Sequence, residues 1–359
     1  MAKIDALLEV LRDREGSDLH LSPTNPPILR IHGILKPLDM EPTTHDGNKE
    51  MLYEIMSEGQ KRRFEQALEL DFAYEVQSIA SRFRTNVFYG RYGLTAVFRL
   101  IPNEIKSLEE LGLPPQLLKC TQFPQGLIVF TGATGSGKST TLAALIDHIN
   151  TTRSDHIITI EDPIEFVHES KQCLVNQREV GKHTRSFAAS LRAALREDPD
   201  VILVGEMRDL ETIELAITAA ETGHLVFSTL HTSSASKTVD RIINVFPSDQ
   251  QEQIRTMLCE SLKGVIAQHL LKTIDGRRAV AVEILWVTPA VANLIREGKT
   301  YQIPSAIQTG KGEGMQLLDQ AIMDLLKARR IAPEEAFRVA RNKAAFETML
   351  GRSAPVAST

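Results

Sequence analysis

The chain has 359 residues, a formal net charge of −5 at pH 7 and an aromatic content of 5%. This length is enough for two domains with separate hydrophobic cores. The slight acidity and the few aromatic side chains argue against a dedicated nucleic-acid binder, which needs basic surfaces and often stacks bases on aromatic rings. The three cysteines lie far apart, with no CxxC pair, which indicates reduced thiols in a cytosolic protein and predicts no zinc site.

The first hundred residues predict an α+β domain. The amphipathic start, MAKIDALLEVLRDRE, predicts a helix rather than a signal peptide. Short apolar runs predict strands at 28–33, 70–76, 82–91 and 94–100, the last two as a hairpin. Pro102, Pro114 and Pro115 then indicate a linker at 102–118, which follows an N-terminal domain of residues 1–101.

The second domain is expected at 119–350, followed by a flexible tail at 351–359. Near-continuous Val, Ile and Leu runs between helices predict a parallel sheet covered on both faces. These strands are expected at 127–131, 157–160, 201–204 and 225–229. Beyond residue 245 the chain is expected to be mostly helical, with one strand at 279–287. Helical spacing is assigned to Ile254, Leu258, Leu262, Val265 and Ile266. No apolar run is long enough to span a bilayer, so any membrane role is expected to come through a partner.

A phosphate-binding loop is predicted at GATGSGKSTT, residues 132–141, because it matches G-x-x-x-x-G-K-[ST] between a strand and a helix. Its glycines let several backbone N–H groups face one anion, and the helix N-terminus adds positive charge. Lys138 is expected to reach the β- and γ-phosphates of ATP, and Ser139 to ligate Mg²⁺. The residues expected to bind nucleotide are Gly132, Ala133, Thr134, Gly135, Ser136, Gly137, Lys138, Ser139 and Thr140.

A candidate for activating water follows the strand at 201–204, in the run DPDVILVGEMRD. Gly205 stands where many phosphate-loop enzymes have Asp, and Glu206 comes next. A carboxylate at the C-terminal end of a parallel strand faces the crevice where ligands bind. We assign Glu206 to orienting or deprotonating water and to contacting Mg²⁺ through water. A surface ion pair with Arg208 is the alternative.

Three carboxylates, Glu161, Asp162 and Glu165, follow the strand at 157–160. Acidic side chains beside a triphosphate repel it unless a metal ion or water intervenes, so they predict a role in holding either. Glu165 is the second candidate for positioning water. The alternative is an acidic cap for the next helix.

Two histidines, His224 and His231, bracket the strand at 225–229. Neutral imidazole both donates and accepts hydrogen bonds, so each can sense the γ-phosphate or contact an adjacent subunit. We include His231 among the catalytic candidates and His224 as a candidate phosphate sensor. A structural role is the alternative for both.

These segments together resemble the secretion-superfamily ATPases, in which a Walker A loop, an acidic box, a Walker B variant and a histidine box follow in this order. Within that superfamily the chain is similar to the type IV pilus retraction ATPases over almost its whole length. The similarity includes SDLHL (17–21), PPILRIHGILKPL (26–38) and LRAALREDPDVILVGEMRD (191–209). Extension and type II secretion relatives usually carry a four-cysteine zinc element, which the cysteine count excludes.

The segment AVANLIREG (290–298) resembles a retraction-specific element usually written A-I-R-N-L-I-R-E. Val291 and Ala292 stand where that family usually has Ile and Arg. The resemblance implies a retraction-linked surface formed by Asn293, Leu294, Ile295, Arg296 and Glu297.

The resemblance implies an α/β fold with a RecA-like P-loop NTPase core, an N-terminal α+β PAS-like domain and a helical C-terminal region. It also implies a homo-hexamer that uses ATP and Mg²⁺ and pulls pilin subunits from the pilus base. The motor would be cytoplasmic and peripheral at the inner membrane, through a pilus platform protein and without inserting into the bilayer.

The resemblance further implies that Arg84 and Arg99 in the predicted hairpin reach the phosphates, where guanidinium groups neutralise charge on the transferring phosphoryl group. Solvated strand-face arginines are the alternative. Arg192 and Arg196 are weaker candidates, because pairing on a helix surface explains them equally well.

Three other functions stay open. One is an assembly or secretion ATPase of the same superfamily. The second is a nucleic-acid translocase, which is disfavoured because no basic stripe alternates with stacking aromatics, so no nucleic acid is expected as a partner. The third is a non-catalytic scaffold gated by nucleotide, which the glycine at position 205 keeps open.

Overall fold

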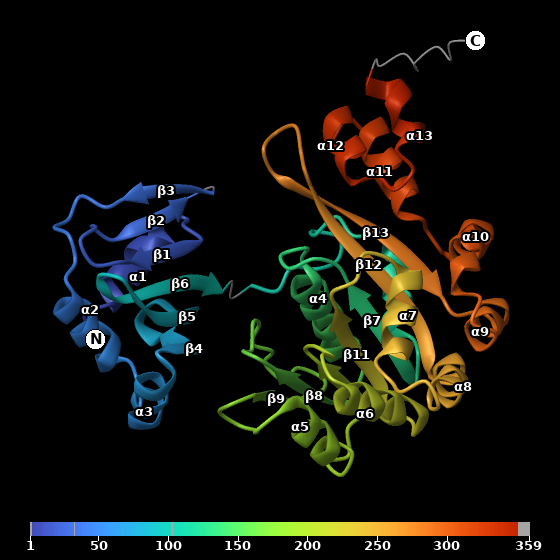
Figure 1. Cartoon of the computed structure of the whole chain (residues 1–359), viewed down its shortest axis with the longest axis horizontal. Helices are drawn as coiled ribbons and strands as arrows, with labels where there is room; N and C mark the ends of the chain where they lie inside the picture. Colours follow the sequence, from blue (N-terminus) through green and yellow to red (C-terminus); the bar gives the residue numbers. More distant parts are fainter. Residues whose placement is uncertain (1, 32, 102–103, 351–359) are drawn as a thin grey trace. The chain divides into compact units, whose positions relative to one another are not determined.

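The computed structural model describes residues 2–31, 33–101 and 104–350. The chain forms two compact units, one of residues 1–104 and 163–167 and the other of residues 105–162 and 168–359. Figure 1 shows the helices and strands of both units. The tail expected at 351–359 and the first two positions of the expected linker lie outside the described residues.

The N-terminal unit is a six-stranded antiparallel sheet in the order β3-β2-β1-β6-β5-β4, with helices packed against it. Its hydrophobic core is formed by the apolar faces of the helices and alternate residues of the strands. The helices are α1 (Asp5–Asp13), α2 (His45–Glu54) and α3 (Glu58–Ala67), with a short 3₁₀ turn, η1 (Gln77–Ile79). The strands are β1 (Asp18–Leu21), β2 (Ile28–Ile31), β3 (Ile34–Pro37), β4 (Glu69–Val76), β5 (Ser81–Gly90) and β6 (Gly93–Ile101).

The second unit has a seven-stranded sheet in the order β13-β12-β7-β11-β10-β8-β9. All neighbouring strands are parallel except β12 and β13, which form an antiparallel hairpin at one edge. The strands are β7 (Gly126–Thr131), β8 (His156–Glu161), β9 (Leu174–Glu179), β10 (Val201–Val204), β11 (Leu225–Leu230), β12 (Leu262–Lys272) and β13 (Arg278–Trp286). Every residue of β7, β10 and β11 is buried, so both faces of these strands are covered, and the predicted parallel α/β core is confirmed.

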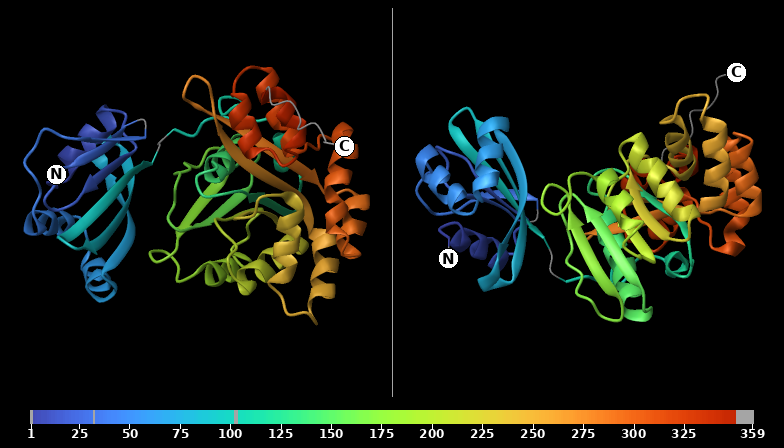
Figure 2. Two further views of the ribbon diagram at one scale, coloured as in Figure 1. Left: turned by 45° about the horizontal axis from the view of Figure 1, so that its top comes forward. Right: turned by 90° about the horizontal axis from the view of Figure 1, so that it is seen from below.

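Helices surround this sheet (Figure 2). α6 packs against β7 and β11, and α7 packs against β12 and β13. The helices of the core are α4 (Lys138–Thr152), α5 (Phe187–Ala194), α6 (Leu210–Glu221), α7 (Ala235–Asn244) and α8 (Gln251–Ser261), preceded by a 3₁₀ helix, η2 (Pro115–Thr121). In the described part of the chain, no helix combines the length and apolarity that a bilayer crossing requires.

The C-terminal region is helical, as expected, and part of it packs against the β12–β13 hairpin in a small core of its own. Its α-helices are α9 (Pro289–Arg296), α10 (Ile303–Thr309), α11 (Leu318–Lys327), α12 (Pro333–Val339) and α13 (Ala344–Glu347). Its 3₁₀ turns are η3 (Thr300–Gln302), η4 (Gly310–Glu313) and η5 (Thr348–Leu350).

The helical assignment of Leu262, Val265 and Ile266 is wrong, because all three lie in β12. Helix α8 ends at Ser261, and the strand begins at the next residue. A short, nearly continuous apolar run fits both a buried helix and a buried strand, so its period did not separate them. Gly264 was the available signal in the sequence, because a glycine inside a strand often marks a place where another group approaches closely. In the structure, a Cβ atom at this position would lie 2.7 Å from the Trp286 ring on β13.

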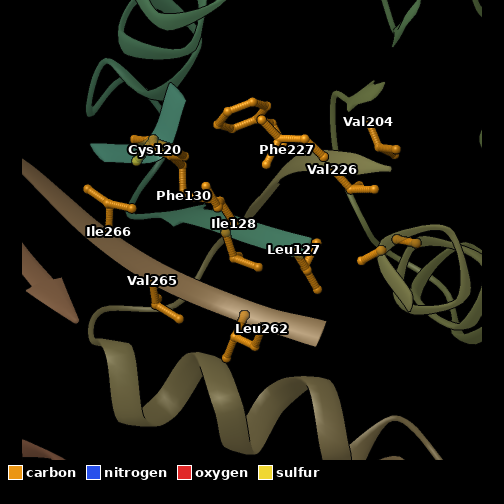
Figure 3. Close-up of a cluster of buried hydrophobic side chains, with 14 of the residues drawn as sticks. Cys120, Leu127, Ile128, Phe130, Val204, Val226, Phe227, Leu262, Val265 and Ile266 are labelled. Carbon is orange, nitrogen blue, oxygen red and sulfur yellow. The ribbon is translucent and has the colours of Figure 1, made fainter. Parts of the chain in front are cut away.

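Side chains from β7, β11 and β12, with Cys120 of η2 and Val204 of β10, form part of the core of this unit (Figure 3). Burying each large apolar side chain contributes about 1.5–3 kcal/mol, so these contacts hold the strands firmly in register. The residues labelled in this view are Cys120, Leu127, Ile128, Phe130, Val204, Val226, Phe227, Leu262, Val265 and Ile266. The loop that follows β7 therefore starts from a rigid support.

Candidate functional site

The glycine-rich segment forms a tight loop between β7, which ends at Thr131, and α4, which begins at Lys138. Gly132 and Gly137 have backbone φ angles of 145° and 87°, which residues other than glycine rarely adopt. A Cβ atom on Gly132 would also lie 2.3 Å from the carbonyl oxygen of Gln268. No side chain caps the N-terminus of α4, which leaves its first N–H groups for an anion.

Lys138 is buried within this loop, with only 8% of its surface exposed. Its Nζ donates hydrogen bonds to the carbonyl oxygens of Gly132, at 2.8 Å, and Ala133, at 3.2 Å. Ser136 Oγ is also buried and has no hydrogen-bond partner among the described residues. A buried ammonium and an orphan hydroxyl in one loop fit the oxygens of a polyphosphate.

Gln268 on β12 fastens the loop to the neighbouring strand, a role that the sequence did not reveal. Its side chain is 2% exposed. Gln268 Nε2 donates to the carbonyl oxygen of Ser136 at 2.8 Å, and Gln268 Oε1 accepts from Thr141 Oγ1 at 2.9 Å. One amide group therefore bridges the loop and the first turn of α4. It was missed because β12 was assigned as a helix.

Gln268→Leu is expected to raise the dissociation constant for ATP about tenfold. The substitution leaves the Ser136 carbonyl and the Thr141 hydroxyl buried without their partner, at a cost of about 1–3 kcal/mol to the loop conformation. Titration of the purified variants with nucleotide measures this effect. Gln320→Leu, at an exposed position of α11, is the matched control. Equal affinities in wild type and Gln268→Leu would contradict the assignment.

Glu206 lies just beyond β10, at the same carboxyl edge of the sheet as the phosphate loop. One carboxylate oxygen is 2.7 Å from Arg208 Nη2, and the other is 3.1 Å from His231 Nε2. Glu206 thus makes the pair with Arg208 that was the alternative to a catalytic role, and it also contacts His231. Burial would raise its pKa, but Arg208 and His231 outweigh burial and hold the pKa of Glu206 below its ordinary value. The group is ionised at neutral pH, as a general base must be.

Gly205 has a packing reason to be glycine. Its N–H donates to the carbonyl oxygen of Ile160 on the neighbouring β8 at 2.8 Å. A Cβ atom at position 205 would lie only 3.2 Å from that same oxygen. The aspartate that many phosphate-loop enzymes have at this position would therefore crowd β8, and Glu206 is the carboxylate at the end of β10.

His231 follows β11 directly and lies beside the phosphate loop, because Leu230 pairs in register with Thr131. The Thr232 N–H donates to Thr131 Oγ1 at 2.8 Å, and the two threonine hydroxyls lie 2.7 Å apart. The loop that carries His231 is thus attached to the last residue before Gly132. This places the imidazole next to both Glu206 and the nucleotide site.

His224 is wrongly assigned as a phosphate sensor within this chain. It precedes β11, and its carbonyl oxygen accepts from the N–H of Gly126 at the start of β7. It therefore lies a whole strand, about 20 Å, from the phosphate loop. The His224 ring instead contacts the carbonyl oxygen of Ala219 in α6 at 2.9 Å. Its imidazole fastens the end of α6.

The acidic box begins at the end of β8, where Glu161 Oε1 accepts from Thr159 Oγ1 at 2.7 Å and from Gln177 Nε2 at 3.1 Å. Because β8 neighbours β10, Glu161 lies at the same sheet edge as Glu206. The next element after β8 is the strand β9, so these carboxylates are not the cap of a following helix. Glu165 lies in the segment 163–167 of the N-terminal unit, and its water-positioning role stays a prediction.

Arg84 on β5 and Arg99 on β6 are directly opposite each other in the N-terminal sheet. Their side chains are 41% and 67% exposed. Arg99 Nε donates to Asp18 Oδ1 at 2.8 Å, while Arg84 Nε is 3.9 Å from Asp71. The two guanidinium groups form one exposed basic pair, and their contact with phosphates stays a prediction.

The weaker arginine candidates lie on the helical surface of the second unit. Arg192 on α5 pairs with Glu211 on α6, which is the alternative expected for it. Arg196 is exposed just after α5.

The segment that resembles the retraction element forms α9, but its residues do not all lie on the surface. Asn293, Arg296 and Glu297 are exposed, and Leu294 is half-buried. Ile295 is fully buried in the main core of the unit. Its assignment to a surface is wrong, because the helical period turns it into the core, on the side where α9 packs against α8 and α10, and away from solvent.

Residues 4–283 match the family described as Type II/IV secretion system protein. The chain is 53% identical over 333 residues to the "Type IV pilus retractation ATPase PilT" of Pseudomonas aeruginosa, covering 93% of this chain and 96% of that protein. It is 54% identical over 317 residues to the "Twitching motility protein" of Neisseria gonorrhoeae, covering 88% and 84%. A solved structure of the pilus retraction motor PilT with bound ADP matches with a TM-score of 0.90 and 47% identity, covering 97% of this chain and all of that one.

Proposed function

The chain belongs to the type II/IV secretion system protein family, and from this premise we propose that it is an ATPase motor that drives type IV pilus retraction. One observation carries the chemistry: the Glu206 carboxylate, held by His231, lies at the same sheet edge as the buried Lys138 loop. A base-competent carboxylate beside a phosphate cradle is what hydrolysis of ATP requires.

In the reaction, Lys138 and the loop N–H groups hold the phosphates of ATP, and Glu206 orients and deprotonates the attacking water. His231 fixes the position of that carboxylate. Mg²⁺, when bound, neutralises charge between the phosphates; Ser139 would hold it directly and Glu206 through water. Hydroxyl and carboxylate oxygens are donors of the kind that Mg²⁺ prefers, so the residues fit the ion. Arg84 and Arg99 are proposed to reach the phosphates when ATP binds, since nucleotide drives a domain motion only by contacting one arrangement better.

The assembly that we propose is a homo-hexamer, cytoplasmic and peripheral at the inner membrane through a pilus platform protein, with no nucleic-acid partner. Its support is the similarity to a pilus retraction motor over nearly the whole chain. We propose domains at 1–101 and 119–350, joined by the linker 102–118. In support, the first sheet ends with β6 at Ile101 and the second starts with β7 at Gly126.

A gene deletion in the piliated source organism tests this function. The expected phenotype is cells with abundant pili that no longer retract, restored by the wild-type gene and not by Lys138→Ala. Loss of pili instead of loss of retraction would indicate the assembly ATPase alternative. Undiminished retraction would contradict the proposal.

The double substitution of Asn293→Ala and Arg296→Ala is expected to abolish retraction, because both residues are exposed in the segment that resembles a retraction-specific element. ATP turnover in vitro should stay within about twofold of wild type, because exposed substitutions of this kind change the stability of the fold little. Ile295→Ala is the contrasting variant, since removing a buried Ile side chain costs about 2–5 kcal/mol of stability. It should lower the melting temperature, whereas the double variant should not. Lost turnover in a stably folded double variant would assign these exposed residues to the catalytic cycle.

A further inference from the structure

A buried carboxylate joins the loop that carries His231 to the C-terminal helices. Glu283 on β13 is 1% exposed. Its Oε1 accepts a hydrogen bond from the N–H of Ala235, the first residue of α7, at 2.8 Å. Arg341, which follows α12, donates to both carboxylate oxygens of Glu283. The pair connects two segments that are 58 residues apart in the sequence.

Arg341 is anchored on both sides. Its own N–H and that of Asn342 donate to the two carboxylate oxygens of Asp319 on α11, each at 2.8 Å. On the other side, Arg341 Nη2 donates to the carbonyl oxygen of Ser233 at 2.7 Å. Ser233 is two residues beyond His231. The guanidinium group therefore reaches from the C-terminal helices to the backbone of the loop that carries His231.

The loop between β11 and α7 is thus held at two places. Thr232 is bonded to Thr131, next to the phosphate loop. Ser233 and Ala235 are bonded to the Arg341–Glu283 pair. His231, whose ring contacts Glu206, directly precedes the first of these two attachments in the chain. A shift of the buried pair would move the backbone that directs this imidazole.

Buried ion pairs add little net stability, but removing one partner leaves an uncompensated charge and is strongly unfavourable. Such a pair therefore favours one discrete arrangement of the segments it joins. We propose that Arg341 and Glu283 are positioning residues for ATP hydrolysis, which hold the His231 loop in the arrangement that keeps Glu206 beside the phosphates. This inference rests on the proposed ATPase function. It makes the C-terminal helices a second support of the catalytic site.

Arg341→Lys and Glu283→Gln test the proposal in the full-length purified chain. Arg341→Lys keeps the charge but loses the planar fork that reaches Glu283 and Ser233 together. In each of the two variants we expect kcat for ATP hydrolysis to fall by about ten- to a hundredfold, the size of effect that a small misplacement of catalytic groups has. The dissociation constant for ATP should change less than about twofold, because the contacts of the phosphate loop are untouched. Arg338→Lys, in an exposed pair with Glu335 on α12, is the matched control.

A double-mutant comparison separates positioning from a general loss of fold. If Arg341 acts through His231, adding Arg341→Lys to His231→Ala should cause no further loss of kcat. Losses that multiply would overturn the proposal, as would a wild-type kcat in Arg341→Lys. A wild-type chain without ATPase activity would instead refute the proposed function itself.

Chemical rescue provides a readout that packing alone would not give. Arg341 lines a cavity of about 340 Å³, together with Ser233, Lys237, His269, Leu318 and Val339. A free guanidinium ion therefore has room to replace the side chain in Arg341→Ala. Millimolar guanidinium is expected to restore part of kcat in this variant and none in His231→Ala. Absence of rescue in folded Arg341→Ala would count against the proposal; if that variant does not fold, the Arg341→Lys comparison decides.

Discussion

Lys138→Ala is expected to abolish ATP hydrolysis and to weaken ATP binding by about a hundredfold. Each hydrogen bond to a charged group is worth about 1.5–3 kcal/mol, and the Lys138 ammonium is proposed to contact two phosphates. Its loss also removes the donor that joins the Gly132 and Ala133 carbonyl groups inside the loop. Binding is measured by titration with nucleotide, and hydrolysis by release of inorganic phosphate.

The matched control for this variant is Lys171→Ala. Lys171 pairs with Asp147 on α4 at 2.6 Å, on a half-exposed surface. Such surface pairs contribute about 0–1 kcal/mol, so binding and turnover should remain near wild type. If Lys138→Ala binds ATP as tightly as wild type does, the loop is not the phosphate site.

Glu206→Gln is expected to lower kcat by about a thousandfold, within the range that general base catalysis contributes. The amide keeps the size of the side chain but accepts no proton at neutral pH. Affinity for ATP should stay within about threefold, because the loss falls on the transition state rather than on binding. Glu211→Gln, at an exposed position of α6, is the control.

Two outcomes of this experiment carry different meanings. Wild-type turnover in Glu206→Gln would move the catalytic role to another acidic group, with Glu161 at the adjacent strand end as the first candidate. Turnover at background level in both proteins would favour the nucleotide-gated scaffold that the glycine at position 205 left open.

The phosphate loop was predictable because its determinants are local. A buried strand, a glycine-rich loop and a helix follow one another within residues 126–152. Glu206 was predictable in the same way, because it directly follows the buried strand β10 at its carboxyl end. His224 was misassigned although the same rule applied. In a parallel sheet the start of a strand lies at the edge opposite the ligand crevice, so only His231 was suitably placed.

Long-range partners were not predictable from a single sequence. Gln268 reaches the phosphate loop over a sequence separation of 132 residues, and its strand was assigned as a helix. Arg341 and Glu283 meet only because the C-terminal helices fold back onto β13. Glu283 stands alone in the apolar run 279–287, which indicates a buried carboxylate but does not identify its partner, and no local pattern distinguishes Arg341 from ordinary surface charges.

Some missed elements did carry a signal. Helix α3 begins with a capping box, in which Ser57 Oγ accepts from the N–H of Gln60 and the Gln60 side chain accepts from the N–H of Ser57. Helix α2 is capped at its N-terminus by Thr44, whose side chain accepts from the N–H of Gly47. Strand β3 is exposed along its whole length, so it has no alternating burial that a sequence pattern could show.

A calorimetric titration of the purified full-length chain with a slowly hydrolysed ATP analogue and Mg²⁺ tests most directly whether this fold clasps a triphosphate. The predicted result is a saturable heat of binding that disappears in Lys138→Ala. A titration without any heat in the wild-type chain, repeated at two temperatures, would contradict the account.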